Sequence, residues 1–181
     1  TISNMSFSNG STMGAIAGMS EYTVSISGVK AMGEISGNEN VGGLIGSGKG
    51  NITISNVTMG ASVTGKKNVG GIVGYHVGGS VVSNCHNSGY IKSDKTDCGG
   101  VVGNVQDSDT IVSDCTNSGT VEGVTSVGGI AGYNNGTIAN CYSSGDISGK
   151  SQDKKYEYVH GNGYADVAGI PAVLVGFCRP L

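Results

Sequence analysis

The chain has 181 residues, of which 34 are Gly, and only 13% of its residues are charged, with a formal net charge of −3. Val and Ile far outnumber Leu, and β-branched side chains fit pleated strands better than helices. Gly at this frequency is also unfavourable in helices. The composition therefore excludes an all-helical or doubly wound fold, and the hydrophobic content of 37% argues against a disordered chain.

The charges and the apolar segments narrow the range of partners. The 10 Lys and Arg residues are scattered, so no basic face is available to neutralise nucleic-acid phosphates. No apolar stretch is long enough to cross a bilayer, so we expect no membrane insertion. The most apolar segment, 165–177, contains Asp166 and Pro171 and is expected to be buried core.

A five-residue pattern of two glycines, two apolar residues and a third glycine recurs along the chain. Its copies begin at residues 42, 70, 99 and 128, with a variant at 14, so the steps are 28 or 29 residues long. One apolar residue precedes each copy: Met13, Val41, Val69, Cys98 and Val127. We expect the glycines to allow positive φ at corners and to let the chain bend without a Cβ clash.

Two further elements follow each glycine pattern. The first has the form apolar-Ser-Asn-apolar, as in residues 54–57 and 82–85. The second is centred on Ile or Val between polar neighbours, as in residues 62–65 and 120–123. This alternation indicates strands with one face inward. Each unit is therefore predicted to hold three short strands separated by Gly, Asn and Ser turns.

A unit of this size cannot bury its own apolar side, whereas stacked units can. Strands that recur in one order without hairpins must pair in parallel. We predict an all-β fold, a parallel and right-handed β-helix with about six coils of ~28 residues, over residues 1–149. Residues 150–181 are predicted to be a charged loop followed by a degenerate final coil, in which 167–170 resumes the register, or by a cap. A sandwich or propeller is the alternative, although propeller blades are usually longer.

Equivalent residues of stacked coils should form vertical columns. One predicted column is Met5, Val29, Val57, Cys85, Cys115 and Cys141. Its neighbour is Asn4, Gly28, Asn56, Asn84, Asp114 and Asn140. Stacked amides can bond to each other and to the backbone of adjacent coils, so we expect Asn56 to be buried.

The unit at 127–145, VGGIAGYNNGTIANCYSSG, resembles the GLUG repeat of bacterial surface proteins, which is named for Gly, Leu, any hydrophobic residue and Gly. Residues 43–46, Gly-Leu-Ile-Gly, fit that name literally. The resemblance covers roughly 10–149. It implies a bacterial, extracellular setting, as in adhesin-like proteins and in non-catalytic parts of immunoglobulin-A-cleaving peptidases, and it brings no catalytic residues.

The cysteines are expected to be small buried hydrophobes that are mostly reduced. Three of them share one repeat position, and adjacent coils bring α-carbons within reach of a disulfide. A disulfide between Cys115 and either Cys85 or Cys141 is therefore an open alternative. No Cys-x-x-Cys occurs, which argues against a zinc site.

The histidines give no catalytic prediction. His76 falls in a predicted turn, His86 alternates to the outer face beside Thr58, Thr116 and Tyr142, and all three histidines, including His160, are expected to be solvated. No His-Glu-x-x-His motif is present, so we predict neither catalytic residues nor a cofactor.

Carboxylates cluster at one turn. Asp107, Asp109 and Asp114 lie within eight residues, and calcium binding there is an open alternative to a simple polar turn. Asp94 and Asp97 are expected to lie in a solvated loop.

Four tyrosines are expected to point outward: Tyr75, Tyr90, Tyr133 and Tyr142. Exposed tyrosines stack on sugars or anchor proteins, so these residues are the candidates for binding a host or surface glycan or protein.

The sequence thus predicts a structural or adhesion module of a secreted or cell-surface protein, which acts as a rigid spacer or a binding face. The alternative is a non-catalytic accessory domain of a large extracellular enzyme such as a peptidase, and a carbohydrate-active β-helix enzyme ranks third. Uncapped strand edges recruit further strands, so we also expect either end-to-end self-association or continuation into a longer chain.

Overall fold

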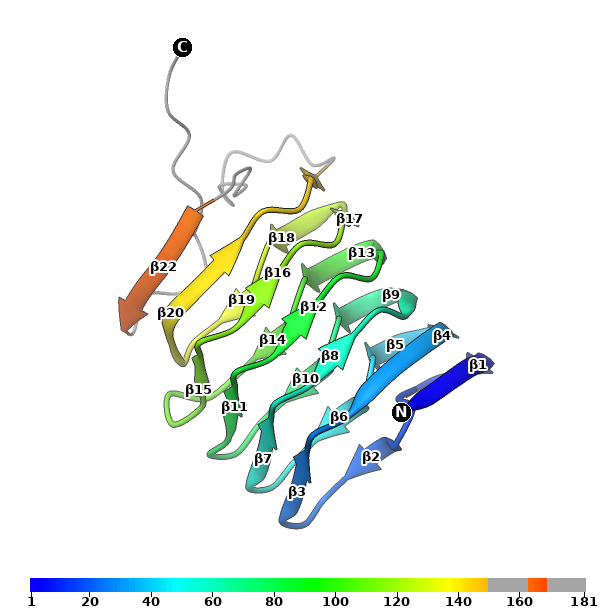
Figure 1. Ribbon diagram of the computed structural model, residues 1–181, viewed down its shortest axis with the longest axis horizontal. Helices are drawn as coiled ribbons and strands as arrows, with labels where there is room; N and C mark the ends of the chain where they lie inside the picture. Colours follow the sequence, from blue (N-terminus) through cyan, green and yellow to red (C-terminus); the bar gives the residue numbers. More distant parts are fainter. Residues whose placement is uncertain (150–162, 169–181) are drawn as a thin grey trace.

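The computed structural model describes residues 1–149 and the backbone of strand β22 (Gly163–Ala168). The described residues form strands and turns without a helix, and the chain winds as one stack of coils (Figure 1). Ile26 lies beside Ile54, and Val82 lies beside Ile54 on its other side, both in parallel register. One turn of the coil therefore advances the chain by 28 residues here. The predicted all-β parallel solenoid is confirmed.

Each coil contains the three predicted strand positions. The apolar-Ser-Asn element forms β3 (Val24–Ser27), β7 (Ile52–Ser55), β11 (Val81–Ser83), β15 (Ile111–Ser113) and the start of β20 (Thr137–Ser143). The alternating element belongs to β1 (Ile2–Gly10), β4 (Lys30–Gly37), β9 (Ser62–Gly70), β13 (Ile91–Gly99), β17 (Val121–Gly123) and β21 (Ile147–Gly149). The glycine pattern leads into a separate five-stranded sheet of β2 (Ala17–Ser20), β6 (Ile45–Gly48), β10 (Val73–His76), β14 (Val102–Val105) and β19 (Ala131–Asn134).

Shorter strands complete the coil between these positions. Two-residue strands follow the Asn corner: β8 (Thr58–Met59), β12 (His86–Asn87) and β16 (Thr116–Asn117). The residues before each glycine pair are also extended, either as separate strands, β5 (Glu39–Gly42) and β18 (Thr125–Gly128), or as the ends of β9 and β13. This additional segment was not predicted.

The stack has about five turns, as the five strands of the second sheet indicate. Strand β1 adds one further strand, with Ile2 beside Ala31 and Phe7 beside Ile35. Met5 is paired with Gly33, so the predicted placement of Met5 and Asn4 in the corner columns was wrong. The reason is that a register shift between Ile2 and Met5 offsets β1 along β4. The handedness stays a prediction.

At the other end, β22 runs antiparallel to β20, with Val167 beside Ile138. Val167 therefore does not resume the parallel register, and β22 covers the edge of β20 as a cap would. The predicted loop at 150–158, His160 and Cys178 lie outside the described residues.

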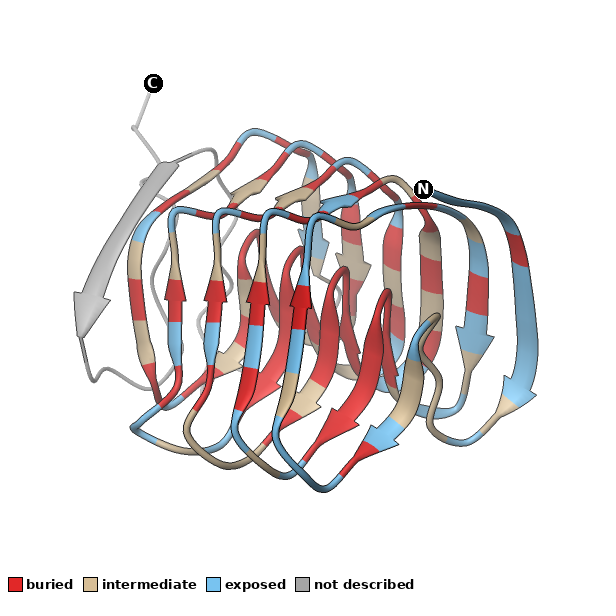
Figure 2. Cartoon of the chain, turned by 60° about the horizontal axis from the view of Figure 1, so that its bottom comes forward, coloured by how far each residue is buried: buried red, intermediate tan, exposed pale blue. Residues whose placement is uncertain are grey.

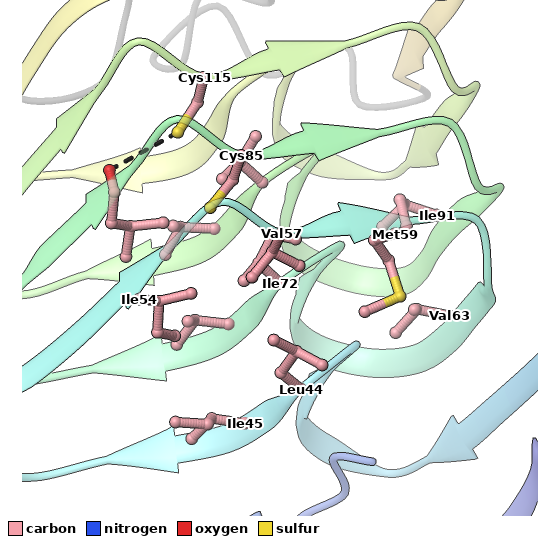
Figure 3. Packing of buried hydrophobic residues seen from close by; sticks show 14 of the residues in the cluster. Leu44, Ile45, Ile54, Val57, Met59, Val63, Ile72, Cys85, Ile91 and Cys115 are labelled. Atoms are coloured by element: carbon pink, nitrogen blue, oxygen red, sulfur yellow. Dashed lines mark hydrogen bonds between the residues drawn. The ribbon is translucent and has the colours of Figure 1, made fainter. Parts of the chain in front are cut away.

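The core is a set of vertical files of Val, Ile and other apolar side chains inside the coil. Buried and exposed positions alternate along most strands (Figure 2). Leu44 and Ile72 occupy the same position in successive coils, and both are fully buried with Ile54 in the interior (Figure 3). Burying such side chains contributes about 1.5–3 kcal/mol each, and because every coil adds to the same files, the stacking of coils supplies the stability.

The glycine pattern is explained by close backbone approach. A Cβ on Gly70 would lie 2.0 Å from the carbonyl oxygen of Val73, where the chain folds back onto itself. A Cβ on Gly71 would lie 2.1 Å from the carbonyl oxygen of Gly100 in the next coil. A Cβ on Gly74 would lie 2.6 Å from the backbone nitrogen of Val41 in the preceding coil. The pattern thus lets three backbone segments touch.

The prediction that the glycines of the pattern adopt positive φ was wrong. Among glycines of the described residues, only Gly28, Gly33 and Gly78 have positive φ, and none belongs to the pattern. The left-handed corners are instead made by short polar residues, which tolerate this conformation better than most. Apart from Asn4 and Asn9 in β1, they form two columns, one of Asn56, Asn84, Asp114 and Asn140, and one of Asn40, Asn68, Asp97 and Ser126.

We predict that Gly70→Ala lowers the free energy of unfolding by about 3 kcal/mol, because the added methyl group must displace backbone atoms of its own and the next coil. Gly60→Ala is the matched control, since its Cβ would meet no atom closer than 3.6 Å. Urea unfolding of both variants tests this. Equal stability of the two variants would contradict the explanation.

Candidate functional site

Val57, Cys85, Cys115 and Cys141 form the predicted column, and all four are buried. Paired residues bracket each step: Ser83 lies beside Ser113, and His86 lies beside Thr116. Three of these side chains can be seen stacked in Figure 3. The column faces the core just after the left-handed corner, where a small apolar side chain fits.

The thiols of this column hydrogen-bond within the wall. Cys85 and Cys115 each donate to the carbonyl oxygen two residues earlier, at 3.1 Å, and Cys141 does so at 3.2 Å. The amide of Cys115 donates to the sulfur of Cys141 at 3.4 Å. Hydrogen bonding to Cys141 and to Cys85, together with burial, raises the pKa of the Cys115 thiol far above its usual range.

Cys98 is a separate buried thiol in the column of Val69 and Val127. Burial raises the pKa of Cys98 well above its usual range. Because the thiolate is the nucleophile, neither Cys98 nor Cys115 is poised for covalent catalysis.

His76 is buried, which corrects the predicted solvated position. Its Nε2 atom hydrogen-bonds to the carbonyl oxygen of Gly78, because the turn folds back over the ring. Its Nδ1 atom has no hydrogen-bond partner within the described part of the chain. Desolvation lowers the pKa of His76, against the opposing effects of Gly78 and Asp107. The other described histidine, His86, is half-buried on the outer wall, with Nδ1 2.7 Å from Thr116 Oγ1.

The carboxylate of Asp107 holds the neighbouring turns together. It accepts hydrogen bonds from the amide of Gly78 in the preceding coil at 2.6 Å, and from the amide of Asp109 and the hydroxyl of Thr110 at 3.2 Å each. Within residues 1–149 and 163–168, no group of three His, Cys, Asp or Glu side chains could hold a metal ion. The calcium alternative therefore gains no support from the geometry of this turn.

Asp97 was predicted to be solvated but is half-buried at the second left-handed corner. Its carboxylate accepts a hydrogen bond from Asn104 at 2.8 Å, and desolvation raises its pKa. Asp94 is exposed, as predicted, and pairs with Lys92 at 3.7 Å. The predicted loop is thus partly strand β13, which turns Asp97 toward the second sheet.

The four candidate tyrosines lie in three columns over both sheets. Tyr75 and Tyr133 flank Asn104 in the second sheet, as predicted, and are half-buried. Tyr142 lies beside Thr116, in the column of His86. The hydroxyl of Tyr90 donates to Glu122 at 2.7 Å, and desolvation with the nearby carboxylate raises the pKa of Tyr90 to about 12. The structure therefore brings together only Tyr75 and Tyr133, two coils apart.

The predicted Asn column lies on the outer surface, so the expectation that Asn56 is buried was wrong. Its amides still form inter-coil bonds, with Asn84 donating to Asn56 at 2.5 Å. The left-handed residue interrupts the alternation of the strand and turns its side chain outward.

Asn87 and Asn117 are buried amides that the sequence analysis missed, and Asn68, Asn104 and Asn134 are buried as well. Asn87 donates to Asn117 at 2.8 Å, and each side chain also closes its own turn by bonding to Gly89 or Gly119. The recurring Asn-Ser-Gly at 87–89 and 117–119 is the signal that could have located Asn87 and Asn117.

No helix of the described residues combines the length and the hydropathy that crossing a membrane requires.

Two stretches of the chain, 65–92 and 123–148, match the family described as the GLUG motif. Each stretch contains one glycine fold-back and one Asn-Cys corner. The chain therefore contains two GLUG motifs. The glycines of the motif are thus the residues at which its coils touch.

A solved structure described as a putative immunoglobulin A1 protease from Bacteroides ovatus is similar to this chain, with a TM-score of 0.56 and 21% sequence identity. The similarity covers 84% of this chain and 47% of that one, so the chain spans about half the length of that protein. At this identity the similarity shows the fold alone. No curated protein matches the sequence.

We predict that the free energy of unfolding decreases as the pH falls from about 7.5 to about 5.5. The folded-state pKa of His76 is lowered, so the unfolded chain takes up a proton first and is favoured as the pH falls through the ordinary His value. Above the ordinary His pKa, the contribution of His76 to the free energy of unfolding is fully present.

His76→Val should reduce this pH dependence, because Val105 fills the same position in the next coil. His86→Thr is the control for a ring on the outer wall. Urea unfolding at several pH values measures the slope. An unchanged slope in His76→Val would contradict the assignment.

Proposed function

We propose that this chain is a non-catalytic structural module of a secreted or cell-surface bacterial protein, which acts as a rigid spacer. The observation that carries the proposal is the file of paired residues that continues from coil to coil. Ile35, Val63, Ile91, Val121 and Ile147 follow one another in a single file through parallel pairs. A load applied along the axis would therefore be shared by backbone hydrogen bonds at every step.

The chemistry of the described side chains supports a structural role. The thiols of Cys85, Cys98, Cys115 and Cys141 are buried, and the Asp107 carboxylate bonds to its own and a neighbouring turn. These groups contribute to the wall and to the core, and their polar atoms are largely engaged by neighbouring coils.

The extracellular setting is supported by the GLUG motif and by the similarity in fold to the Bacteroides ovatus protein. That similarity also favours the second candidate function, an accessory domain of a larger extracellular enzyme, because the chain spans 47% of that protein. Tyr75 and Tyr133 would be the first residues to test for an adhesion role, since they flank one polar residue on the second sheet.

A coil deletion tests the spacer function. Removing residues 57–84 joins Asn56 to Cys85, which restores the corner because Cys85 occupies the position of Val57 in the next coil. Spin labels at Ser25 and Ser144, both exposed, should move closer by about 5 Å with an equally narrow distance distribution. The labels are attached to introduced cysteines in a chain whose native cysteines are replaced by valine.

Removing residues 57–70 is the control, because half a coil destroys the register and should broaden the distance distribution. A broad distribution in the full-length chain would contradict a rigid spacer. Unchanged folding and distance after both deletions would contradict the coil model on which the proposal depends.

A further inference from the structure

We propose that the column of Cys85, Cys115 and Cys141 is a site of disulfide formation in which Cys115 pairs with either neighbour and so joins two adjacent coils covalently. The oxidant is a small-molecule disulfide, such as oxidised glutathione, which exchanges with the thiols of the column. It would add a covalent cross-link to a wall that is otherwise held by hydrogen bonds and packing.

The register places the three residues at successive steps of the stack. Ser83, Ser113 and Ala139 are paired on one side of the column, and His86, Thr116 and Tyr142 are paired on the other. Neighbouring strands lie about 4.8 Å apart, which falls within the Cα separations of about 4.4–6.8 Å that a disulfide spans. Adjacent members of the column are thus within reach.

The side chains also approach one another. The Cys115 thiol reaches toward the preceding coil and donates to the carbonyl oxygen of Val82 at 3.5 Å, and the Cys115 amide bonds to the sulfur of Cys141 at 3.4 Å. Cys85 and Cys141 are two steps apart, about 9.6 Å, which exceeds the reach of a disulfide. The column can therefore form one disulfide per chain, and Cys115 belongs to it in either pairing.

The other cysteines have different positions. Cys98 lies in another column between Val69 and Val127, so it should stay a thiol and serve as an internal control. Cys178 lies outside the described residues and is replaced by serine in the experiment below.

The chemistry is two successive thiol–disulfide exchanges. A thiolate of the column attacks oxidised glutathione, forms a mixed disulfide and releases one glutathione thiolate. The second thiolate then attacks the protein sulfur of the mixed disulfide and releases the other glutathione thiolate. Two electrons pass from the protein to glutathione, and the two thiol protons end on the two released glutathiones.

Access determines when this reaction occurs. Cys85 is 2% exposed, while Cys115 and Cys141 are fully buried, so an oxidant reaches them when coils are open, as in folding. The folded, reduced chain should therefore keep its thiols, and a chain that folds in oxidised glutathione should acquire the cross-link.

The test refolds the Cys178→Ser chain from denaturant with oxidised and reduced glutathione, then maps the disulfides by mass spectrometry of peptides. We expect one intramolecular disulfide, with Cys115 in every cross-linked peptide and Cys98 free. The melting temperature should rise by several degrees and return to its original value with a reductant.

Valine variants separate the pairings, because Val57 is the natural occupant of the column in the second coil. Cys85→Val should leave only the Cys115–Cys141 bond, and Cys141→Val only the Cys85–Cys115 bond. Cys115→Val should form no intramolecular disulfide and show no melting shift. Circular dichroism confirms that each variant folds.

Three results would overturn the proposal. The first is a Cys85–Cys141 bond in the folded Cys115→Val chain. The second is that the Cys178→Ser chain, Cys85→Val and Cys141→Val all refold in oxidised glutathione with every remaining cysteine of the column recovered as a free thiol. The third is a disulfide of Cys98 in place of the column. None of these results bears on the spacer function, which the coil deletion tests separately in a chain without native cysteines.

Discussion

The architecture depends on direct contact between backbones at the glycine fold-back. At Gly42, Gly70, Gly99 and Gly128 a Cβ would lie 2.0 Å from a carbonyl oxygen of the same coil. At the following glycine, as in Gly43 and Gly71, the obstructing carbonyl belongs to the next coil. Only a residue without a side chain allows both approaches at once. The pitch of the stack and the fold of each coil are therefore set by the same few atoms.

Polar side chains provide hydrogen-bond partners for the backbone groups that the close-packed turns bury. Close-packed turns leave amide and carbonyl groups without water, and such groups must find partners. Asn117 supplies them by bonding to both the amide and the carbonyl of Gly119 while it contacts Asn87 and Ser143 in the neighbouring coils. On the outer surface, the side chain of the corner residue Asn84 bonds to that of Asn56 in the neighbouring coil. A column of amides thus satisfies the turns and aligns the coils together.

The repeat period, the parallel pairing and the cysteine column could be predicted because equal spacing in the sequence becomes equal height in a stack. Which side of the wall a residue faces was harder to predict. Asn56 follows the alternation of its strand until its own left-handed conformation breaks it. His76 is buried by a turn that Asp107 of the next coil holds in place, and such a contact leaves no periodic signal. Close approach and positive φ both favour glycine, so the sequence alone could not separate them.

The turn between the second sheet and the following strand varies in length, while the strands on either side of it stay in register. It has two residues at 135–136 and five at 106–110, yet Val105 and Asn134 stay in register on one side, and Ile111 and Thr137 on the other. Length changes at this corner are therefore absorbed locally. It is the natural position for evolution, or for protein engineering, to graft a recognition loop, and loops inserted in consecutive coils would emerge as an evenly spaced row.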